Sequence, residues 1–122
     1  MPHRLGFVLT VLVLALVFPA LAADPTGKWS ATFDTMVGQQ KYTYQFKLVG
    51  DKLTGRAVSQ NGDVEIQEGK VSGDVITFVE NINFQGNDLR IEYTGKISGD
   101  EIRFTRKVAD YATEELVAKR EK

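Results

Sequence analysis

The 122-residue sequence contains no cysteine and a single histidine, His3. Without cysteine the chain can form neither a disulfide nor a thiolate ligand, and His3 lies in an N-terminal segment that we expect to be removed. The remaining chain therefore cannot build a His/Cys zinc site, a Ser-His-Asp or Cys-His nucleophile, or a haem site held by His or Cys. No stretch has EF-hand spacing, and Asn61-Gly62-Asp63 indicates a turn rather than a calcium loop. We expect neither a metal nor a cofactor.

Residues 1–23 have the pattern of a signal peptide. His3 and Arg4 give a short basic start, residues 5–18 are almost wholly apolar, and residues 20–23 are small residues suited to cleavage. A membrane helix needs roughly 20 apolar residues, and this run is shorter. We predict a secreted or periplasmic protein with no membrane attachment after cleavage. A retained N-terminal anchor is the alternative.

Removing residues 1–23 leaves 99 of the 122 residues, which predicts one domain, residues 24–122. Its formal charge is −2, from 14 Lys and Arg (the 15 of the whole chain less Arg4) against 16 Asp and Glu. A nucleic-acid-binding protein carries a basic face, so this balance argues against nucleic acid as a partner. We expect a monomer.

The chain is organised around a repeated Gly-Asp pair. Residues 95–104 (GKISGDEIRF) have a near copy at 69–78 (GKVSGDVITF) and a looser one at 46–55 (FKLVGDKLTG). In each copy the pair lies between residues that favour strands, which predicts a two-residue hairpin turn with glycine at positive φ. The turns are expected at Gly50-Asp51, Gly73-Asp74 and Gly99-Asp100.

These turns fix the register of three hairpins. On one face of the sheet, aliphatic pairs follow each turn, and one step further an aromatic residue is expected to lie over a glycine of the partner strand. The aliphatic pairs are Leu48–Leu53, Val71–Ile76 and Ile97–Ile102, and the aromatic–glycine pairs are Phe46–Gly55, Phe78–Gly69 and Phe104–Gly95.

Further alternating runs predict the remaining strands. We expect a three-residue turn at Asn61-Gly62-Asp63 and a two-residue turn at Gly86-Asn87 that pairs Phe84 with Leu89. Residues 113–120 favour a helix by propensity, but seven strands would leave the first strand unpaired, so we assign this tail as an eighth strand. The predicted fold is all-β: an eight-stranded antiparallel up-and-down β-barrel.

The predicted interior is closed and aliphatic at the Gly-Asp end and polar above it. An inward carboxylate and guanidinium are costly unless they are paired or solvated. In one hypothesis the polar residues form a satisfied internal network; in the other they line an open cup that holds a small amphiphilic or sugar-like ligand, possible partners being a lipid or an oligosaccharide. The candidate ligand-binding residues are Tyr42, Tyr44, Gln67, Glu80, Tyr93 and Arg106.

Gly27 and Trp29 at the start of the first strand, with Arg120 near the end of the last, resemble the calycin superfamily of lipocalins and avidins. Lipocalins carry Gly-x-Trp on the first strand and cover this Trp with a basic residue from the C-terminal part, and avidins share the start Thr-Gly-Lys-Trp. The resemblance implies a structural role for Gly27, Trp29 and Arg120. The chain lacks the lipocalin disulfide and lid loop and a second Trp, which argues against biotin as the ligand.

The motifs Thr-Gly-Lys-Trp, Gly-Asp-Lys-Leu-Thr-Gly and Ile-Glu-Tyr-Thr-Gly-Lys-Ile-Ser-Gly-Asp also resemble a group of small exported bacterial proteins, some of them labelled glycoside hydrolases or xylanases. The resemblance implies a carbohydrate-active enzyme as an alternative to non-catalytic binding. Glycoside hydrolysis needs two carboxyl groups. Glu65 and Glu80 would be diagonal neighbours on paired strands, with Glu80 as base or nucleophile and Glu65 as acid.

A third hypothesis is an accessory or structural module that docks on a partner protein or a cell-wall glycan. Such a module needs an exposed aromatic patch, and Tyr111, beyond the seventh predicted strand, is the candidate for it. The sequence therefore leaves three classes of function open, with non-catalytic ligand binding as the leading one.

Overall fold

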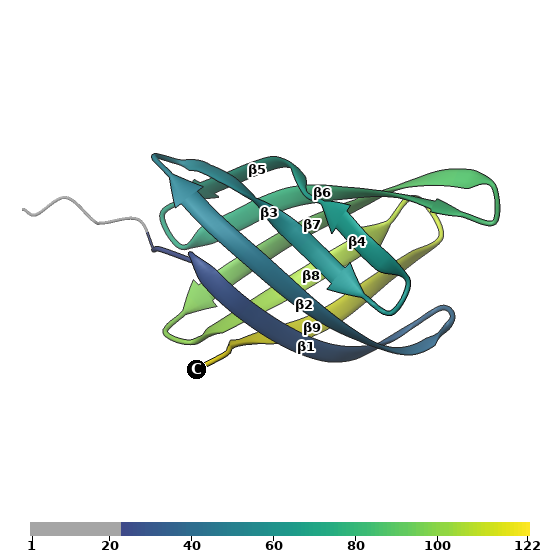
Figure 1. Cartoon of the computed structure of the whole chain (residues 1–122), viewed down its shortest axis with the longest axis horizontal. Coiled ribbons are helices and arrows are strands. Elements are labelled where there is room, and N and C mark those ends of the chain that lie inside the picture. The colour runs from purple at the N-terminus through teal and green to yellow at the C-terminus, as the bar shows by residue number, and fades with distance from the viewer. Residues whose placement is uncertain (1–22) are drawn as a thin grey trace, which may run out of the picture.

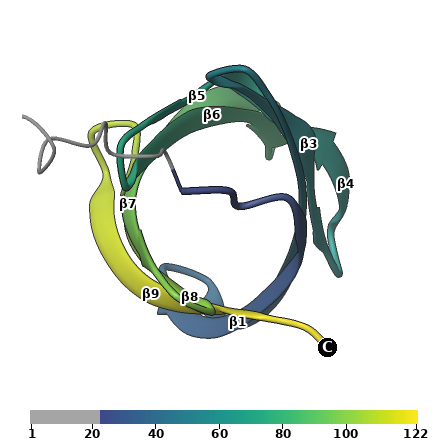
Figure 2. The same ribbon diagram turned by 90° about the vertical axis from the view of Figure 1, so that its left-hand side faces the viewer.

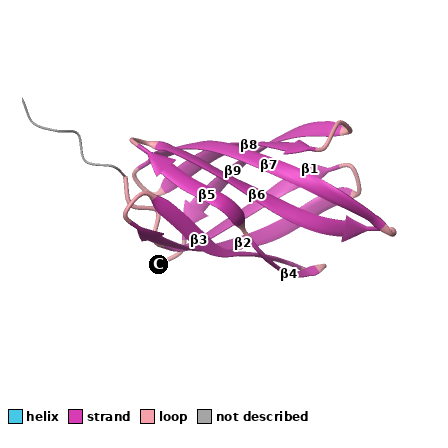
Figure 3. Cartoon of the chain, turned by 90° about the horizontal axis from the view of Figure 1, so that it is seen from above, coloured by secondary structure: helices cyan, strands magenta, loops and turns pink. Residues whose placement is uncertain are grey.

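The computed structural model describes residues 23–122; the predicted signal peptide, apart from Ala23, lies outside them. The described chain consists of strands and short turns, with no helix (Figure 3). The strands are β1 (Gly27–Thr35), β2 (Gly38–Val49), β3 (Lys52–Ser59), β4 (Gly62–Glu65), β5 (Gln67–Ser72), β6 (Val75–Phe84), β7 (Asn87–Ser98), β8 (Glu101–Val108) and β9 (Ala112–Arg120).

The strands close into an eight-stranded antiparallel barrel, which confirms the predicted fold class. β4 and β5 are two parts of one strand interrupted at Ile66, and both pair with β3. Around the barrel the order is β2, β1, β9, β8, β7, β6, β5 and β3, and β3 returns to β2. Figure 1 shows the barrel from the side and Figure 2 looks along it. Each strand thus pairs with its neighbours in sequence, and β9 closes on β1.

Two ends of the barrel follow from this meander. One end, which we call the floor, carries the turns Gly50–Asp51, Gly73–Asp74 and Gly99–Asp100. The opposite end, which we call the mouth, carries the β1–β2, β3–β4, β6–β7 and β8–β9 turns. The three floor turns lie where the repeat predicted them, and their glycines have positive φ values of 61° to 67°.

The tail is a strand in spite of its helical propensity. β9 pairs with β8 along its whole length and with β1 at Trp29 and Ser30. Its alternate residues Glu114, Leu116 and Ala118 are buried. Pairing on both edges and burial of this face outweigh a propensity difference of less than about 0.7 kcal/mol per residue.

The predicted three-residue turn at Asn61-Gly62-Asp63 is wrong. The chain turns in two residues, Gln60–Asn61, so Ser59 pairs with Gly62 and Ala57 with Val64. A turn shorter by one residue moves every following side chain to the opposite face. Ile66 is therefore buried, and Glu65 and Gln67, which were expected to face inward, are exposed.

A β-bulge restores the original facing before the next turn. The register between β5 and β6 shifts between Gln67 and Lys70, and Glu68 adopts a φ of 53°. Beyond the bulge Val71 pairs with Ile76, as predicted. The bulge thus compensates for the short turn, so the error is confined to residues 61–69.

The aromatic–glycine pairs were predicted with mixed success. Gly95 pairs with Phe104, whose ring occupies the space of a Cβ at Gly95, and Phe46 pairs with Gly55. The pairing of Gly69 with Phe78 is wrong, because the bulge removes Gly69 from that position and places it opposite Leu53 of β3.

The turn between β6 and β7 is Gln85–Gly86 rather than the predicted Gly86-Asn87. Both residues have positive φ, 52° and 83°, as a type I′ hairpin turn requires. Phe84 consequently opposes Asn87, and Leu89 opposes Ile82. The register differs from the predicted one by two residues, so the same side chains of both strands point into the barrel.

The floor half of the barrel is filled by side chains. Aromatic rings meet there at centroid distances of 4.2 Å for Phe78–Tyr93 and 5.5 Å for both Phe46–Phe78 and Tyr93–Phe104. Aromatic pairs at such distances stabilise a core beyond the area that they bury. The predicted aliphatic floor lies below them, and only the mouth half is left for polar residues and a ligand.

Candidate functional site

A buried arginine forms the centre of the polar interior. Arg106 of β8 is 4% exposed and donates from Nε to the Tyr93 hydroxyl (2.8 Å), from Nη1 to a Glu114 carboxylate oxygen, and from Nη2 to the Tyr42 hydroxyl (3.1 Å). A carboxylate oxygen of Glu80 lies 3.8 Å from Nη2. These residues, with Tyr44, are called the Arg106 network below. Every nitrogen of the guanidinium has a partner within the protein.

The directions of the tyrosine hydrogen bonds follow from the number of protons. The Tyr93 hydroxyl has one proton and donates it to Glu80 over 2.9 Å. The Tyr44 hydroxyl lies 2.9 Å from the Tyr93 hydroxyl. Because Tyr93 has no second proton, Tyr44 must be the donor in this contact. Tyr93 thus accepts from Tyr44 and Arg106 and donates to Glu80, which fixes its ring and its three hydrogen-bond partners.

The network places two carboxylates against one guanidinium. Glu80 is 1% exposed, and burial raises the pKa of its carboxyl group, although Arg106 and the Tyr93 hydrogen bond act in the opposite direction. Burial also raises the pKa of Tyr44 and Tyr93 well above the ordinary value, so both phenols are neutral. With Glu80 and Glu114 ionised, the network carries one more negative charge than positive.

Strand register brings these residues together. Arg106 opposes Tyr93 on β7 and Glu114 on β9, so the three form a row across three adjacent strands. Glu80 on β6 and Tyr42 on β2 enter from the remaining walls. The Arg106 guanidinium also lies 5.2 Å from the centre of the Tyr42 ring. The network therefore covers the aromatic core on the side of the mouth.

A hollow opens above the network at the mouth. This mouth pocket has a volume of ≈ 70 Å³, and its base includes Arg106 and Glu114. Its apolar lining comes from three strands, β6, β7 and β8, and from the β1–β2 turn. The apolar residues are Met36, Val37, Ile82, Phe84, Leu89, Ile91 and Val108, and Thr35, Gln40, Tyr42 and Asn61 complete the lining.

A second hollow, the side notch, lies in the barrel wall between β4 and β6. It has a volume of ≈ 590 Å³. It shares part of its lining with the mouth pocket and is therefore continuous with it. The shared residues are Val37, Gln40, Tyr42, Asn61, Ile82 and Phe84, and the others are Ser59, Gln60, Gly62, Val64, Glu80, Asn81, Asn83 and Gln85.

The notch exists because two strand edges diverge. β5 pairs with β6 only as far as Gln67–Val79, and β4 pairs with β3 alone. The second half of β6, residues 80–84, and β4 therefore have no ladder partner on the sides that face each other, and the strands separate toward the mouth (Figure 3). The bulge at Glu68 lies at this point, and the register on β3 shifts by one residue between β4 and β5.

Five of the six predicted ligand-binding residues belong to the Arg106 network. Tyr44 and Tyr93 are fully buried in it and line neither hollow, whereas Tyr42, Glu80 and Arg106 border one or both. The sixth, Gln67, is exposed on the outer face because of the short Gln60–Asn61 turn.

Two site residues were missed from the sequence. Glu114 is the inward residue of β9 opposite Arg106, and its position follows from the alternation that buries Leu116 and Ala118. Gln40 is 7% exposed and faces inward because β2 begins at Gly38, directly after the turn at Met36–Val37, and Gln40 alternates with the inward Tyr42.

The proposed carboxylate pair Glu65 and Glu80 is not formed. Glu80 is buried in the network, while Glu65 is exposed on the outer face of β4, opposite Arg56. The facing of Glu65 was inferred from a three-residue turn that the chain does not make. The two carboxylates that do face the interior, Glu80 and Glu114, both contact Arg106.

The Gly27, Trp29 and Arg120 cluster lies at the floor, far from both hollows. Arg120 covers the indole of Trp29 at 4.3 Å from the ring centre and donates to the backbone carbonyl of Thr26 over 2.8 Å. The indole nitrogen donates to the carbonyl of Pro25 over 2.8 Å. These contacts join β1 to β9 and hold Pro25 and Thr26, which precede β1, against the barrel.

Exposed apolar residues gather at the mouth. Met36, Val37, Phe84 and Tyr111 lie in or beside its turns, and Tyr111, on the β8–β9 turn, is 69% exposed. The other two large exposed apolar residues of the described chain, Val49 and Val75, border the floor turns. An apolar rim around a hollow is typical of a binding site.

Residues 23–122 contain no group of three or more His, Asp or Glu side chains placed to hold a metal ion. Within the same residues no helix is long and apolar enough to cross a membrane. Comparison of the chain with protein-family models, with curated proteins and with solved structures found no match.

Proposed function

We propose that this protein binds a small amphiphilic molecule at the mouth of its barrel and does not transform it. The observation that carries the proposal is the hollow above the Arg106 network, whose walls are apolar and whose rim exposes Met36, Val37 and Phe84. Small-molecule sites combine such apolar walls with a few oriented polar groups. The polar groups here are Gln40, Tyr42 and Asn61.

The Arg106 network is the base of this site rather than its gripping group. Three of the five guanidinium N–H groups already donate, one from each nitrogen, to Tyr93, Glu114 and Tyr42. A ligand that took one of these donors would leave a buried carboxylate or hydroxyl without its partner, which costs about 1–3 kcal/mol. The network therefore supports a fixed base, and the ligand binds above it.

Non-catalytic binding is favoured over glycoside hydrolysis by the placement of the carboxylates. An acid and a nucleophile or base must both face one hollow. Glu65 is on the outer face, and Glu80 and Glu114 are both engaged by the same guanidinium. An arginine placed between two carboxylates pairs with both of them as a structural group.

We further propose that the barrel is of the calycin type and acts outside the cytoplasm after removal of residues 1–23. The position of Arg120 over Trp29 on the first strand supports the first part. The basic start, the apolar run and the small residues of the N-terminal segment support the second part.

Native mass spectrometry of the protein recovered from a bacterial periplasm tests the function. The protein is mixed with alkyl glycosides, fatty acids and xylo-oligosaccharides. Retained mass is expected, and it is expected to disappear in Ile82→Trp, because Ile82 lines both hollows and the larger side chain fills them. Val49→Trp adds the same group at the exposed floor end and serves as control. Shortened oligosaccharides, or binding that survives Ile82→Trp, would refute the proposal.

A further inference from the structure

Side-chain amides are concentrated at the mouth. The chain has ten Asn and Gln residues. All but Gln45 and Gln67 lie in the mouth turns or in the adjoining ends of β2, β6 and β7: Gln39, Gln40, Gln60, Asn61, Asn81, Asn83, Gln85 and Asn87. An amide presents a donor and an acceptor without charge. Six of these eight line the mouth pocket or the side notch.

The backbone adds further neutral hydrogen-bonding groups to the notch. β4 and residues 80–84 of β6 have unpaired edges that face each other, and an unpaired strand edge presents alternating N–H donors and C=O acceptors. The notch thus combines backbone and amide groups, both of which can donate and accept.

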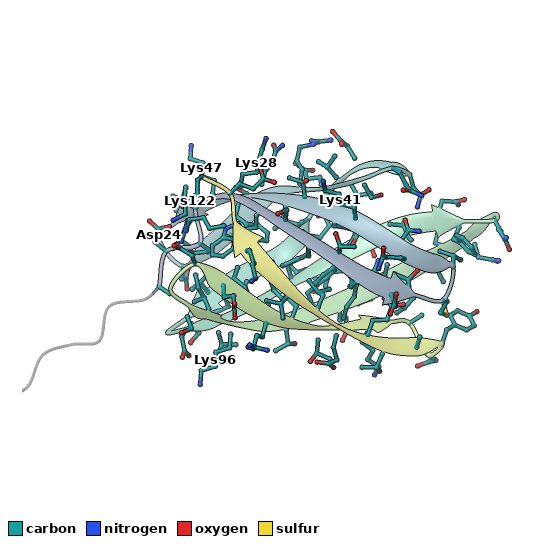
Figure 4. The ribbon with its side chains drawn as sticks, turned by 90° about the horizontal axis from the view of Figure 1, so that it is seen from below. Asp24, Lys28, Lys41, Lys47, Lys96 and Lys122 are labelled. Carbon is teal, nitrogen blue, oxygen red and sulfur yellow. The ribbon has the colours of Figure 1, made fainter. Side chains whose placement is uncertain are left out.

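Few charged residues line the two hollows. The charged residues that line them are Arg106, Glu80 and Glu114. The arginine is neutralised by the carboxylates, so the base of the site presents no free cation and, with both carboxylates ionised, a net negative charge. The labelled Asp24, Lys28, Lys47, Lys96 and Lys122 lie toward the floor, whereas Lys41 lies nearer the middle of the barrel (Figure 4).

We propose that the ligand is an uncharged, polyhydroxylated molecule such as a neutral sugar or short oligosaccharide that carries a small apolar substituent. This inference rests on the proposed function. The hydroxyl-bearing body lies in the side notch, where hydroxyls, which also donate and accept, meet Asn81 and the free edges. The apolar substituent enters the mouth pocket between Leu89 and Val108.

The volumes of the two hollows agree with this division. The notch, at ≈ 590 Å³, lies within the range of about 300–1,000 Å³ that small-molecule sites occupy. The mouth pocket, at ≈ 70 Å³, has room for a short apolar group and not for a long acyl chain. An anionic amphiphile such as a fatty acid is disfavoured on both grounds, because its chain is too large for the pocket and its carboxylate meets Glu80 and Glu114.

Isothermal titration calorimetry with three shape-matched probes tests the inference: butyl β-D-glucoside, butyl β-D-glucuronide and hexanoate. The glucoside is expected to bind at least about tenfold more tightly than either anion, since like charges placed together in a site are costly. Asn81→Leu removes a notch amide and is expected to weaken glucoside binding about fivefold or more. Asn87→Leu removes an amide that lines neither hollow and is expected to leave the affinity unchanged.

The outcomes separate this inference from the function on which it rests. Equal or tighter binding of the glucuronide or of hexanoate would overturn the inference and leave a mouth-binding protein. Glucoside binding that is unaffected by Asn81→Leu would overturn the placement in the notch. If none of the three probes binds, while the xylo-oligosaccharides and longer alkyl glycosides of the mass-spectrometry panel also leave no retained mass, the proposed function fails with it.

Discussion

At the scale of single residues, Arg106 holds the interior polar groups together. It contacts two carboxylates and two hydroxyls at 4% exposure, and it is the positive charge of the Arg106 network. A buried ion pair is often worth little against an apolar replacement of the whole group, but removing one member alone leaves buried charge without compensation. The arginine is therefore expected to matter for folding before it matters for binding.

Replacement of Arg106 by methionine tests this. We expect Arg106→Met to lower the free energy of unfolding by about 3–5 kcal/mol, because Glu80 and Glu114 lose their counter-charge in a buried site. Urea denaturation monitored by circular dichroism measures the change. Arg103→Met on the outer face of the same strand, where the side chain is 74% exposed, is the control and should change stability by about 0.5 kcal/mol or less. A loss below about 1 kcal/mol in Arg106→Met would contradict the role given to the network.

Glu80 provides a second test, through pH. Burial raises the pKa of its carboxyl group in the folded protein above the ordinary value of 4.5. The folded state then binds this proton more tightly than the unfolded state, so its stabilising contribution is complete below about pH 4.5 and is lost as pH rises toward the folded pKa. Wild type should therefore lose stability relative to Glu80→Gln as pH increases above 4.5.

The comparison is made by urea denaturation of both proteins at several pH values between 4 and 8. Taking the difference between the two proteins cancels the contribution of surface carboxylates such as Glu68, whose pKa the Arg90 hydrogen bond lowers and whose effect on stability has the opposite sign. If the difference in the free energy of unfolding stays constant with pH, or grows in favour of wild type, burial does not raise the pKa of Glu80.

At the scale of strands, the length of each turn decides which side chains of the following strand point into the barrel. The Gly-Asp repeats predicted three turns and the aliphatic pairs beside them correctly, because glycine at positive φ and the aliphatic residues both point to the same pairing. The β3–β4 segment lacks a comparable marker: Gln60, Asn61, Gly62 and Asp63 are all turn-forming residues, so two-residue and three-residue turns are equally compatible with them. The bulge at Glu68 that corrects the facing leaves no signal in the sequence.

The candidate site was predictable to the same extent as the turns. Tyr93 and Arg106 follow from the Gly99–Asp100 hairpin, and Tyr42 and Tyr44 from the Gly50–Asp51 hairpin. Gln67 was misplaced by the short turn. The side notch could not be foreseen, since it arises where two strand edges separate and depends on the bulge rather than on residue type.

A pair of alanine substitutions tests the facing of β4 and β5. Ile66 is 5% exposed between the exposed Glu65 and Gln67. Ile66→Ala is expected to cost about 2–5 kcal/mol through lost burial and the cavity left behind. Glu65→Ala should fall within about 0.5 kcal/mol of wild type, as a surface substitution does. Thermal and urea unfolding of both variants measure these changes. A larger loss of stability in Glu65→Ala than in Ile66→Ala would indicate the three-residue turn instead.

At the scale of the whole molecule, the barrel has two unlike ends. The floor is closed by packed rings, by Arg120 over Trp29 and by the join between β1 and β9. The mouth carries the hollows, the amides and most of the exposed large apolar side chains. Closure at one end supplies the stability that lets β4 and β6 remain separated at the other. On the proposed function, the ligand binds at the mouth and not at the floor.

The most direct test is a nuclear magnetic resonance titration of protein carrying labelled Ile, Leu and Val methyl groups with butyl β-D-glucoside. We predict saturable shifts at Ile82, Leu89, Ile91 and Val108, which line the mouth pocket, and none at Leu53 and Ile102 near the floor. Ile82→Trp should abolish the shifts of the remaining mouth methyl groups. Shifts confined to the floor, or spectra unchanged at millimolar glucoside, would contradict a binding site for this class of molecule at the mouth.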